Sequence, residues 1–431
     1  MSRLGPALGI RDFRLWWLAL LGMGVGLQML EVAIGWEVYA QHSSTLDLGF
    51  IGLAEFVPMF VLALPAGQLA DRLPRRLIFG AALLVGAAVA VGLAMLSRSG
   101  DRSVVPYLAL AAGAGITTAL ANPSARAMAP TLVPREVLPS AMTLRSIASQ
   151  AGQVAGPALG GLIYGISPVT VYLLAAVMCV LAAGCIVAVR AQPAADAAQP
   201  AGAELAAAAG RSAPAPPGLS SVLEGLQFVR HTQILLGAIL LDLLAVLFGG
   251  AVALLPVFAR SILHVGPTGL GVLRAAPAIG ALLAAALLTR RPLIHRAGRT
   301  LLLVVGLYGA SMIVFGLSRS FALSLIALGV SGFVDLFSMN IRSTTVALAT
   351  PDRLRGRVSA VEMVFVSASN QLGAFESGLA AFLVGTVPAV VGGGAITVAI
   401  ALGWKRLFPD LARVDRLQEV RPAPADPAVP A

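Results

Sequence analysis

Long apolar runs, separated by short polar turns rich in arginine, dominate this chain. A helix needs about 20 predominantly apolar residues to cross a bilayer. No run shows the alternation of apolar and polar positions over ten residues that membrane strands require. The pattern predicts twelve membrane-spanning helices, with approximate limits 14–40, 47–70, 77–97, 104–128, 139–165, 168–190, 233–258, 268–289, 300–318, 321–348, 358–384 and 386–407.

Composition agrees with this pattern. Of the 431 residues, 58% are hydrophobic and only 12% are charged, whereas soluble domains carry about 25% charged residues. Lipid must therefore be the solvent for most of the surface. The first apolar stretch, 13–39, is too long for the core of a signal peptide and has no small-residue cleavage site after it, so we expect it to remain as the first helix.

The net charge of +10 comes from arginines near the ends of the predicted helices. If the N-terminus is cytoplasmic, 24 of the 30 lysines and arginines fall on the cytoplasmic side. Only four fall in outside loops, namely Arg98, Arg102, Arg260 and Arg319. The positive-inside rule then predicts that both termini are cytoplasmic, and it explains the basic charge without a nucleic-acid partner.

One segment, 191–218, breaks the apolar pattern with alanine, proline and little charge, which is typical of a flexible linker. After it, Leu223, Leu226 and Val229 recur at helical spacing and predict a short amphipathic helix at the membrane surface. The predicted domains are an N-terminal six-helix bundle (1–190), a cytoplasmic linker with this amphipathic helix (191–232), a C-terminal six-helix bundle (233–407) and a cytoplasmic tail (408–431).

The two predicted bundles resemble each other. Aligning Pro58 with Pro277 places Glu55 on Arg274 and the Asp71–Arg72 pair on Arg290–Arg291. Parallel six-helix repeats are typical of one large transporter architecture, in which the substrate path lies between the halves at mid-membrane.

The turn after the second predicted helix reads GQLADRLPRR, from Gly67 to Arg76. It resembles the signature loop of the major facilitator superfamily, with proline where glycine is usual. The resemblance implies a cytoplasmic gate in which Asp71 makes a contact when that side is shut. The gate residues expected from this loop and its counterparts are Gly67, Asp71, Arg72, Arg75, Arg76, Arg126, Asp352, Arg355 and Arg357.

Two further stretches sharpen the resemblance. Gly156, Pro157, Gly160 and Gly161 resemble the helix 5 motif of exporters in this superfamily, although ordinary close packing of helices is an open alternative. The stretches NPSAR from Asn122 and TPDRLRGRV from Thr350 resemble the branch of enterobactin-exporter-like proteins. That branch includes siderophore and multidrug exporters, so the resemblance implies efflux without naming the cargo.

Charges inside the predicted helices are the best site signals, because each costs about 3 kcal/mol on insertion scales. In this superfamily helices 1, 4, 7 and 10 line the cavity, which favours Glu31, Asp242 and Asp335; a buried pair that only fixes helix packing is the alternative for each. As the proton carrier we expect Asp242 first, because it stands in an apolar run with no arginine within a helical turn in sequence, then Asp335 and then Glu31. Glu37 and Glu362 lie near helix ends and are expected to be solvated. The complete set of candidate cavity residues is Asp242, Asp335, Glu31, Gln28, Asn340, Arg342, Asn370, Gln371, Glu55, Arg274 and Glu376.

Signatures of enzymes are missing. The four histidines have no metal-ligand spacing, and Cys179 and Cys185 lie on different faces of one helix, so neither a metal nor a disulfide is expected. No phosphate-binding loop or nucleophile elbow occurs, which excludes an ATP-driven pump on this chain. We expect no catalytic residue and no cofactor.

The sequence thus predicts an all-α secondary transporter of the cytoplasmic membrane, of the major facilitator fold. Its expected action is proton-coupled efflux of a small amphipathic molecule, by a monomer in contact with membrane lipids. Two alternatives stay open: an importer or lipid translocator of the same fold, and a helper or receptor subunit that no longer transports.

Overall fold

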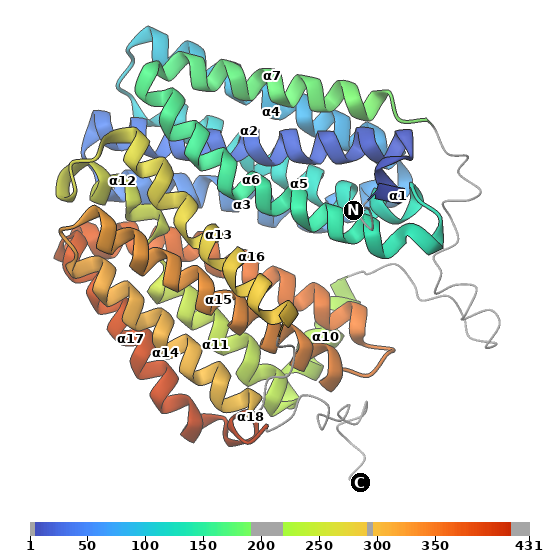
Figure 1. Cartoon of the computed structure of the whole chain (residues 1–431), viewed down its shortest axis with the longest axis vertical. Helices are drawn as coiled ribbons and strands as arrows, with labels where there is room; N and C mark the ends of the chain where they lie inside the picture. The colour runs from blue at the N-terminus through green and yellow to red at the C-terminus, as the bar shows by residue number, and fades with distance from the viewer. Residues whose placement is uncertain (1–4, 191–218, 291–295, 415–431) are drawn as a thin grey trace.

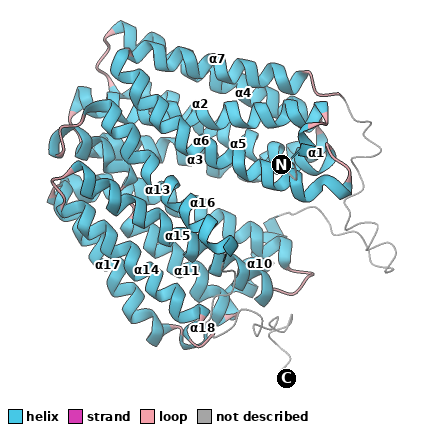
Figure 2. Ribbon diagram, in the orientation of Figure 1, coloured by secondary structure: helices cyan, strands magenta, loops and turns pink. Residues whose placement is uncertain are grey.

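The computed structural model describes residues 5–190, 219–290 and 296–414; within these ranges the side chains of 63–72, 219–222 and Arg290 are not described. The described chain is almost entirely helical, without strands (Figure 2). Twelve long helices form two bundles of six, as the sequence predicts. The linker 191–218 and most of the tail after 407 lie outside the described residues, so the division into four domains stays a prediction.

The first bundle contains α2 to α7. Its helices are α2 (Arg11–His42), α3 (Thr45–Arg72), α4 (Arg75–Ser99), α5 (Val104–Met128), α6 (Leu138–Ile166) and α7 (Pro168–Val187). The short elements α1 (Gly5–Leu8), η1 (Ala129–Thr131) and η2 (Arg135–Val137) flank them.

The second bundle repeats the arrangement, and one span in it is broken. Its long helices are α11 (Gln233–Gly249), α13 (Gly266–Arg290), α14 (Ala297–Leu317), α15 (Phe321–Ala349), α16 (Arg355–Val384) and α17 (Thr386–Leu407). After Gly249 the first span leaves the α-helical path and continues through η3 (Val252–Leu254), α12 (Leu255–Val257) and the π-turn η4 (Phe258–Ile262). The short α10 (Leu219–His231) precedes the bundle and α18 (Pro409–Ala412) follows it.

The amphipathic helix α10 packs onto protein with one face. Phe228 and Val229 are buried in the core of the second bundle. Gly225 lies against Arg357, whose guanidinium forms an ion pair with Glu224. Leu223 on the other face stays 60% exposed. One face of this helix therefore packs on the second bundle, including the start of α16, and Leu223 on the other face remains exposed.

Ten helices of the described chain are long and apolar enough to cross a membrane. The two long helices that miss this criterion are α6 and α16. Both carry polar residues along their length, such as Ser149 and Gln153 on α6 and Asn370 and Gln371 on α16, and these four line a cavity between the bundles. Their lower hydropathy follows from that position, because one face of each helix meets polar space.

The hydrophobic core joins the two bundles at one end only. The largest cluster combines Val38 and Tyr39 of α2 with Phe258 and Leu273 of the second bundle. Two separate clusters fill the other end, one within each bundle. We call the joined end, which holds the turn at 43–44 and the loop 263–265, the sealed end. The bundles diverge toward the opposite end, which carries α1 and α10 (Figure 1).

Glycines allow the close approach at the sealed end. A methyl group on Gly161 of α6 would lie 2.3 Å from the carbonyl oxygen of Pro267 and would also clash with Gly271, both on α13. A methyl group on Gly378 of α16 would lie 2.8 Å from Cα of Gly49 on α3. Two seams, α6 against α13 and α3 against α16, therefore hold the halves together at backbone contact distance.

Candidate substrate cavity

A polar cavity lies between the two bundles. It consists of two lobes of about 440 and 430 Å³, a size usual for small-molecule sites. Both lobes are lined by Glu31, Ile34, Glu55, Gln153 and Gln371, so they form one continuous space. Residues of α2, α3, α6 and α16 meet here, which places the cavity at the centre of the molecule.

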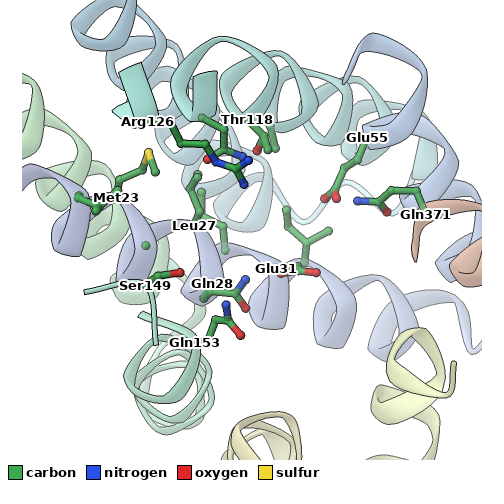
Figure 3. A pocket seen from close by; sticks show the side chains of 16 residues that line it. Met23, Leu27, Gln28, Glu31, Glu55, Thr118, Arg126, Ser149, Gln153 and Gln371 are labelled. Atoms are coloured by element: carbon green, nitrogen blue, oxygen red, sulfur yellow. The ribbon is translucent and has the colours of Figure 1, made fainter. Parts of the chain in front are cut away.

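The first lobe extends from this centre toward the open end. Its wall consists mainly of α2, α5 and α6, with Gln28, Thr118, Asn122 and Arg126 among the polar residues. Figure 3 shows the guanidinium of Arg126 pointing into the same space as the carboxyl groups of Glu31 and Glu55. Nη1 of Arg126 also contacts Sδ of Met363 on α16, at 3.8 Å.

The second lobe reaches into the C-terminal bundle. Arg274, Asp335 and Asn370 are its polar residues beyond the shared centre, together with Tyr308. Apolar side chains make up much of the remaining wall, including Ile51, Met312 and Leu328. A ligand in this lobe would touch apolar surface on several sides and carboxyl groups on others.

One ion pair joins the bundles across the cavity. The guanidinium of Arg274 on α13 contacts the carboxylate of Glu31 on α2. Glu55 of α3 faces the same space and hydrogen-bonds with the side chain of Gln371 on α16. The internal repeat places Glu55 and Arg274 at equivalent positions of the two halves, so these equivalent positions carry side chains of opposite charge.

A second charged group lies in the wall of the C-terminal bundle. Asp242 on α11 is 8% exposed and contacts Arg342 on α15, which is 6% exposed. Nε of Arg342 lies 3.8 Å from the carboxylate of Glu362. Asp335 lies between this group and the cavity, since it lines both the second lobe and a small void beside Asp242. No arginine is in salt-bridge contact with Asp335 or Glu55 in the described part of the chain.

The expectation that Glu37 is solvated is wrong. Glu37 is 4% exposed and accepts hydrogen bonds from the hydroxyls of Tyr107 and Tyr172, both fully buried, and from Gln41. The two tyrosines come from α5 and α7, which are distant from Glu37 in sequence. The tyrosines themselves were the available signal, since polar side chains in apolar helices need partners. Glu362, at the other predicted solvated position, is only partly exposed.

The helix 5 motif packs against two neighbours at once. Gly156 and Gly160 face α2, where added methyl groups would lie 2.5 Å from Cβ of Gln28 and 2.9 Å from Cα of Met29. Gly161 faces α13, and the carbonyl oxygen of Pro157 approaches Gly271. The motif therefore connects a cavity-lining helix with the seam between the halves.

The predicted gate residues whose side chains are described do not form one cluster. Arg75 and Arg76 donate hydrogen bonds to the carbonyl oxygens of Ala127 and Val189, both within the first bundle. Asp352 and Arg355 pair with each other on the surface, at 2.7 Å. The side chains of the remaining predicted gate residues in this loop lie outside the described part of the chain: Gly67, Asp71 and Arg72.

Not every predicted cavity residue lines the two lobes. Asn340 is exposed and Glu376 is half-buried, and neither belongs to the wall of either lobe. Among the described residues, no group of three His, Cys, Asp or Glu side chains could hold a metal ion. The cavity thus offers charges and hydrogen bonds to a solute.

Two helical bundles around a central polar cavity define a membrane transporter of the major facilitator superfamily. A family model described as "Transmembrane secretion effector" matches residues 2–424, and the chain belongs to this family. Its members are multi-pass membrane transporters of small molecules and are not enzymes.

Relatives and solved structures agree with this assignment. The multidrug efflux pump Tap of Mycolicibacterium fortuitum is 28% identical, over 84% of this chain and 87% of that protein. The enterobactin exporter EntS of Citrobacter koseri is 26% identical, over 88% of each chain. Among solved structures, an inward-facing, unoccupied bacterial homolog of the human lysosomal transporter Spinster has a TM-score of 0.70 at 15% identity, covering 96% of this chain and 99% of that chain. The inward-open xylose transporter XylE from E. coli has a TM-score of 0.68 at 14% identity, covering 95% and 99%.

Proposed function

We propose that this chain is a proton-coupled exporter of a small amphipathic molecule in the cytoplasmic membrane. The observation that carries the proposal is the continuous cavity at the junction of the two halves, lined by carboxyl groups and apolar side chains. The similarity to Tap and EntS, whose names describe a multidrug efflux pump and an exporter, supports outward transport.

Alternating access would use the two seams. In the present state the halves meet at the sealed end, and the cavity extends toward the end with α1 and α10. If both termini are cytoplasmic, as the arginine distribution favours, this state faces the cytoplasm. Cargo would enter here, and rocking of one half against the other would open the seams to the outside.

A proton carrier must gain and lose its charge during the cycle, and the structure changes the order of the candidates. Asp242 contacts Arg342, and a neighbouring guanidinium favours the charged form of a carboxyl group. Asp335 and Glu55 line the cavity without such a contact. We therefore assign proton exchange first to Asp335 and Glu55, with Asp242 and Glu31 held in ion pairs in this state.

Purified protein in liposomes tests the function directly. A pH gradient is imposed across the liposome membrane, and a panel of cationic, neutral and anionic amphipathic dyes is offered. At least one dye should move against its gradient, opposite to proton flow, and a protonophore should abolish this movement. Transport in the same direction as protons would indicate an importer. No movement of any dye by a folded protein would favour the helper or receptor alternative.

A further inference from the structure

The carboxyl and guanidinium groups in and beside the central cavity are unequal in number. The described residues in and beside the cavity include five carboxyl groups and three guanidinium groups. The acids are Glu31, Glu55, Asp242, Asp335 and Glu362, and the bases are Arg126, Arg274 and Arg342. Charges in a region surrounded by lipid and apolar helices must be compensated locally. Two carboxyl groups therefore need either a proton or another cation.

The excess is concentrated where a ligand would bind. Arg274 contacts Glu31, and Arg342 contacts Asp242 with Glu362 at 3.8 Å. Glu55 and Asp335 remain, and both line the second lobe, one from each half. Much of the remaining wall of this lobe is apolar, with Ile51, Met312 and Leu328.

We propose that the substrate is an amphipathic cation, whose positive centre binds between Glu55 and Asp335 while its apolar groups contact the lobe wall. This inference rests on the proposed function and adds the charge of the cargo. A cation and protons would compete for the same two carboxyl groups, so release of one accompanies binding of the other. An anionic cargo would meet the opposite field, since it would approach unpaired carboxylates.

Two ions of the same shape and opposite charge separate these possibilities. Tetraphenylphosphonium and tetraphenylborate are titrated into the full-length protein, purified in a neutral detergent, without any gradient. The cation should bind saturably and the anion should not. Each of Glu55→Gln and Asp335→Asn should weaken cation binding by at least about tenfold, as when one partner of a desolvated charge pair is removed. Glu136→Gln, at an exposed position outside the cavity, should leave it unchanged.

A variant that is expected to tighten cation binding separates an effect on the site from misfolding, because misfolding can only weaken binding. Arg274→Gln removes the partner of Glu31 and should tighten cation binding, because a third carboxylate becomes available to the ligand. Equal or tighter binding of the anion, or unchanged cation binding in the variant that combines Glu55→Gln with Asp335→Asn, would overturn the proposal. So would weaker cation binding in Arg274→Gln.

The transport assay tests the proposed function and the binding assay tests the substrate class, so either proposal can be wrong without the other. If the cation binds as described but no dye accumulates under a pH gradient, the proposed function is wrong and the substrate class stands. If only neutral or anionic dyes accumulate, the proposed function stands and the substrate class is wrong.

Discussion

Asp242 and Arg342 form a buried ion pair between α11 and α15, although one hundred positions separate them in the sequence. Neither charge could be placed at low cost without the other, since an unpaired buried charge is strongly unfavourable. Around Asp242 the sequence is apolar on both sides, which made it resemble an isolated proton carrier. The fold gives it a partner instead.

This pair predicts opposite effects of single and double substitution. Asp242→Asn leaves Arg342 with only Glu362 at 3.8 Å and should destabilise the protein by up to about 3–5 kcal/mol, the usual cost of breaking a buried pair. Replacing both residues, with Asp242→Leu and Arg342→Met, should recover most of this loss. Thermal unfolding in detergent measures both effects. A stable Asp242→Asn protein that still concentrates cargo under a pH gradient would show that the charge serves neither packing nor coupling.

The buried carboxylate of Glu37 predicts a stability effect in the first bundle. Tyr172→Phe removes a hydroxyl that donates to Glu37, and leaving a buried acceptor short of a partner costs about 1–3 kcal/mol. The matched control is Tyr308→Phe, whose hydroxyl makes only a long contact of 3.4 Å to the carbonyl oxygen of Gly249. Comparison of the two unfolding midpoints checks the expectation. Equal midpoints would mean that the contact to Glu37 adds nothing to stability.

Sequence reasoning was sufficient for the fold and insufficient for the pairing of charges. Helix number and class follow from apolar run length, which is a local property. The partners of Asp242 and Glu37 lie on helices far away in sequence, and no periodicity reports such contacts. Proximity to a helix end suggested that Glu37 is solvated, but in a bundle the end of a central helix is enclosed by its neighbours.

The glycine motif of helix 5 was likewise predictable from the sequence only in part. Its spacing predicts close packing, yet Gly160 and Gly161 are adjacent and face different helices, α2 and α13. Only the arrangement of the halves shows that the contact of Gly161 with α13 belongs to a seam that must open. The internal repeat did carry information about the cavity, because it aligns Glu55 with Arg274, and both residues line the cavity.

The orientation in the membrane predicts the behaviour of reporter fusions. Fusions at Ala201 and Ala423 should be active only with reporters that work in the cytoplasm, because most lysines and arginines lie on that side. A fusion in the outside loop after Arg102 should give the opposite result. Activity of outside reporters at Ala201 or Ala423 would reverse the direction that we assign to the sealed end.

The seam between α6 and α13 predicts an effect on the conformational balance. Gly161→Ala places a methyl group against the backbone of α13 and should disfavour the sealed state by about 1–3 kcal/mol, as overpacking does. Spin labels on exposed positions Ser103 and Arg319, one near the sealed end of each half, should then show longer distances. The control Gly184→Ala adds a methyl group with nothing within 4 Å and should change nothing. An unchanged distance distribution in Gly161→Ala would argue against this seam as the part that opens.

Coupling is the last prediction, and it concerns Asp335. This carboxyl group lines the cavity and has no salt-bridge partner among the described residues, so it can exchange a proton without breaking an ion pair. One proton moving down a 100 mV potential contributes about 2.3 kcal/mol, enough for roughly a 50-fold cargo gradient. Asp335→Asn should therefore reduce accumulation under an imposed potential or pH gradient to the level of liposomes without protein. Downhill exchange should continue at a reduced rate, since Glu55 still faces the cargo. Uptake of a fluorescent cargo into liposomes, with and without the gradient, separates the two activities. If Asp335→Asn keeps full gradient-driven accumulation, Asp335 is not the carrier, and Glu55→Gln becomes the next variant to test.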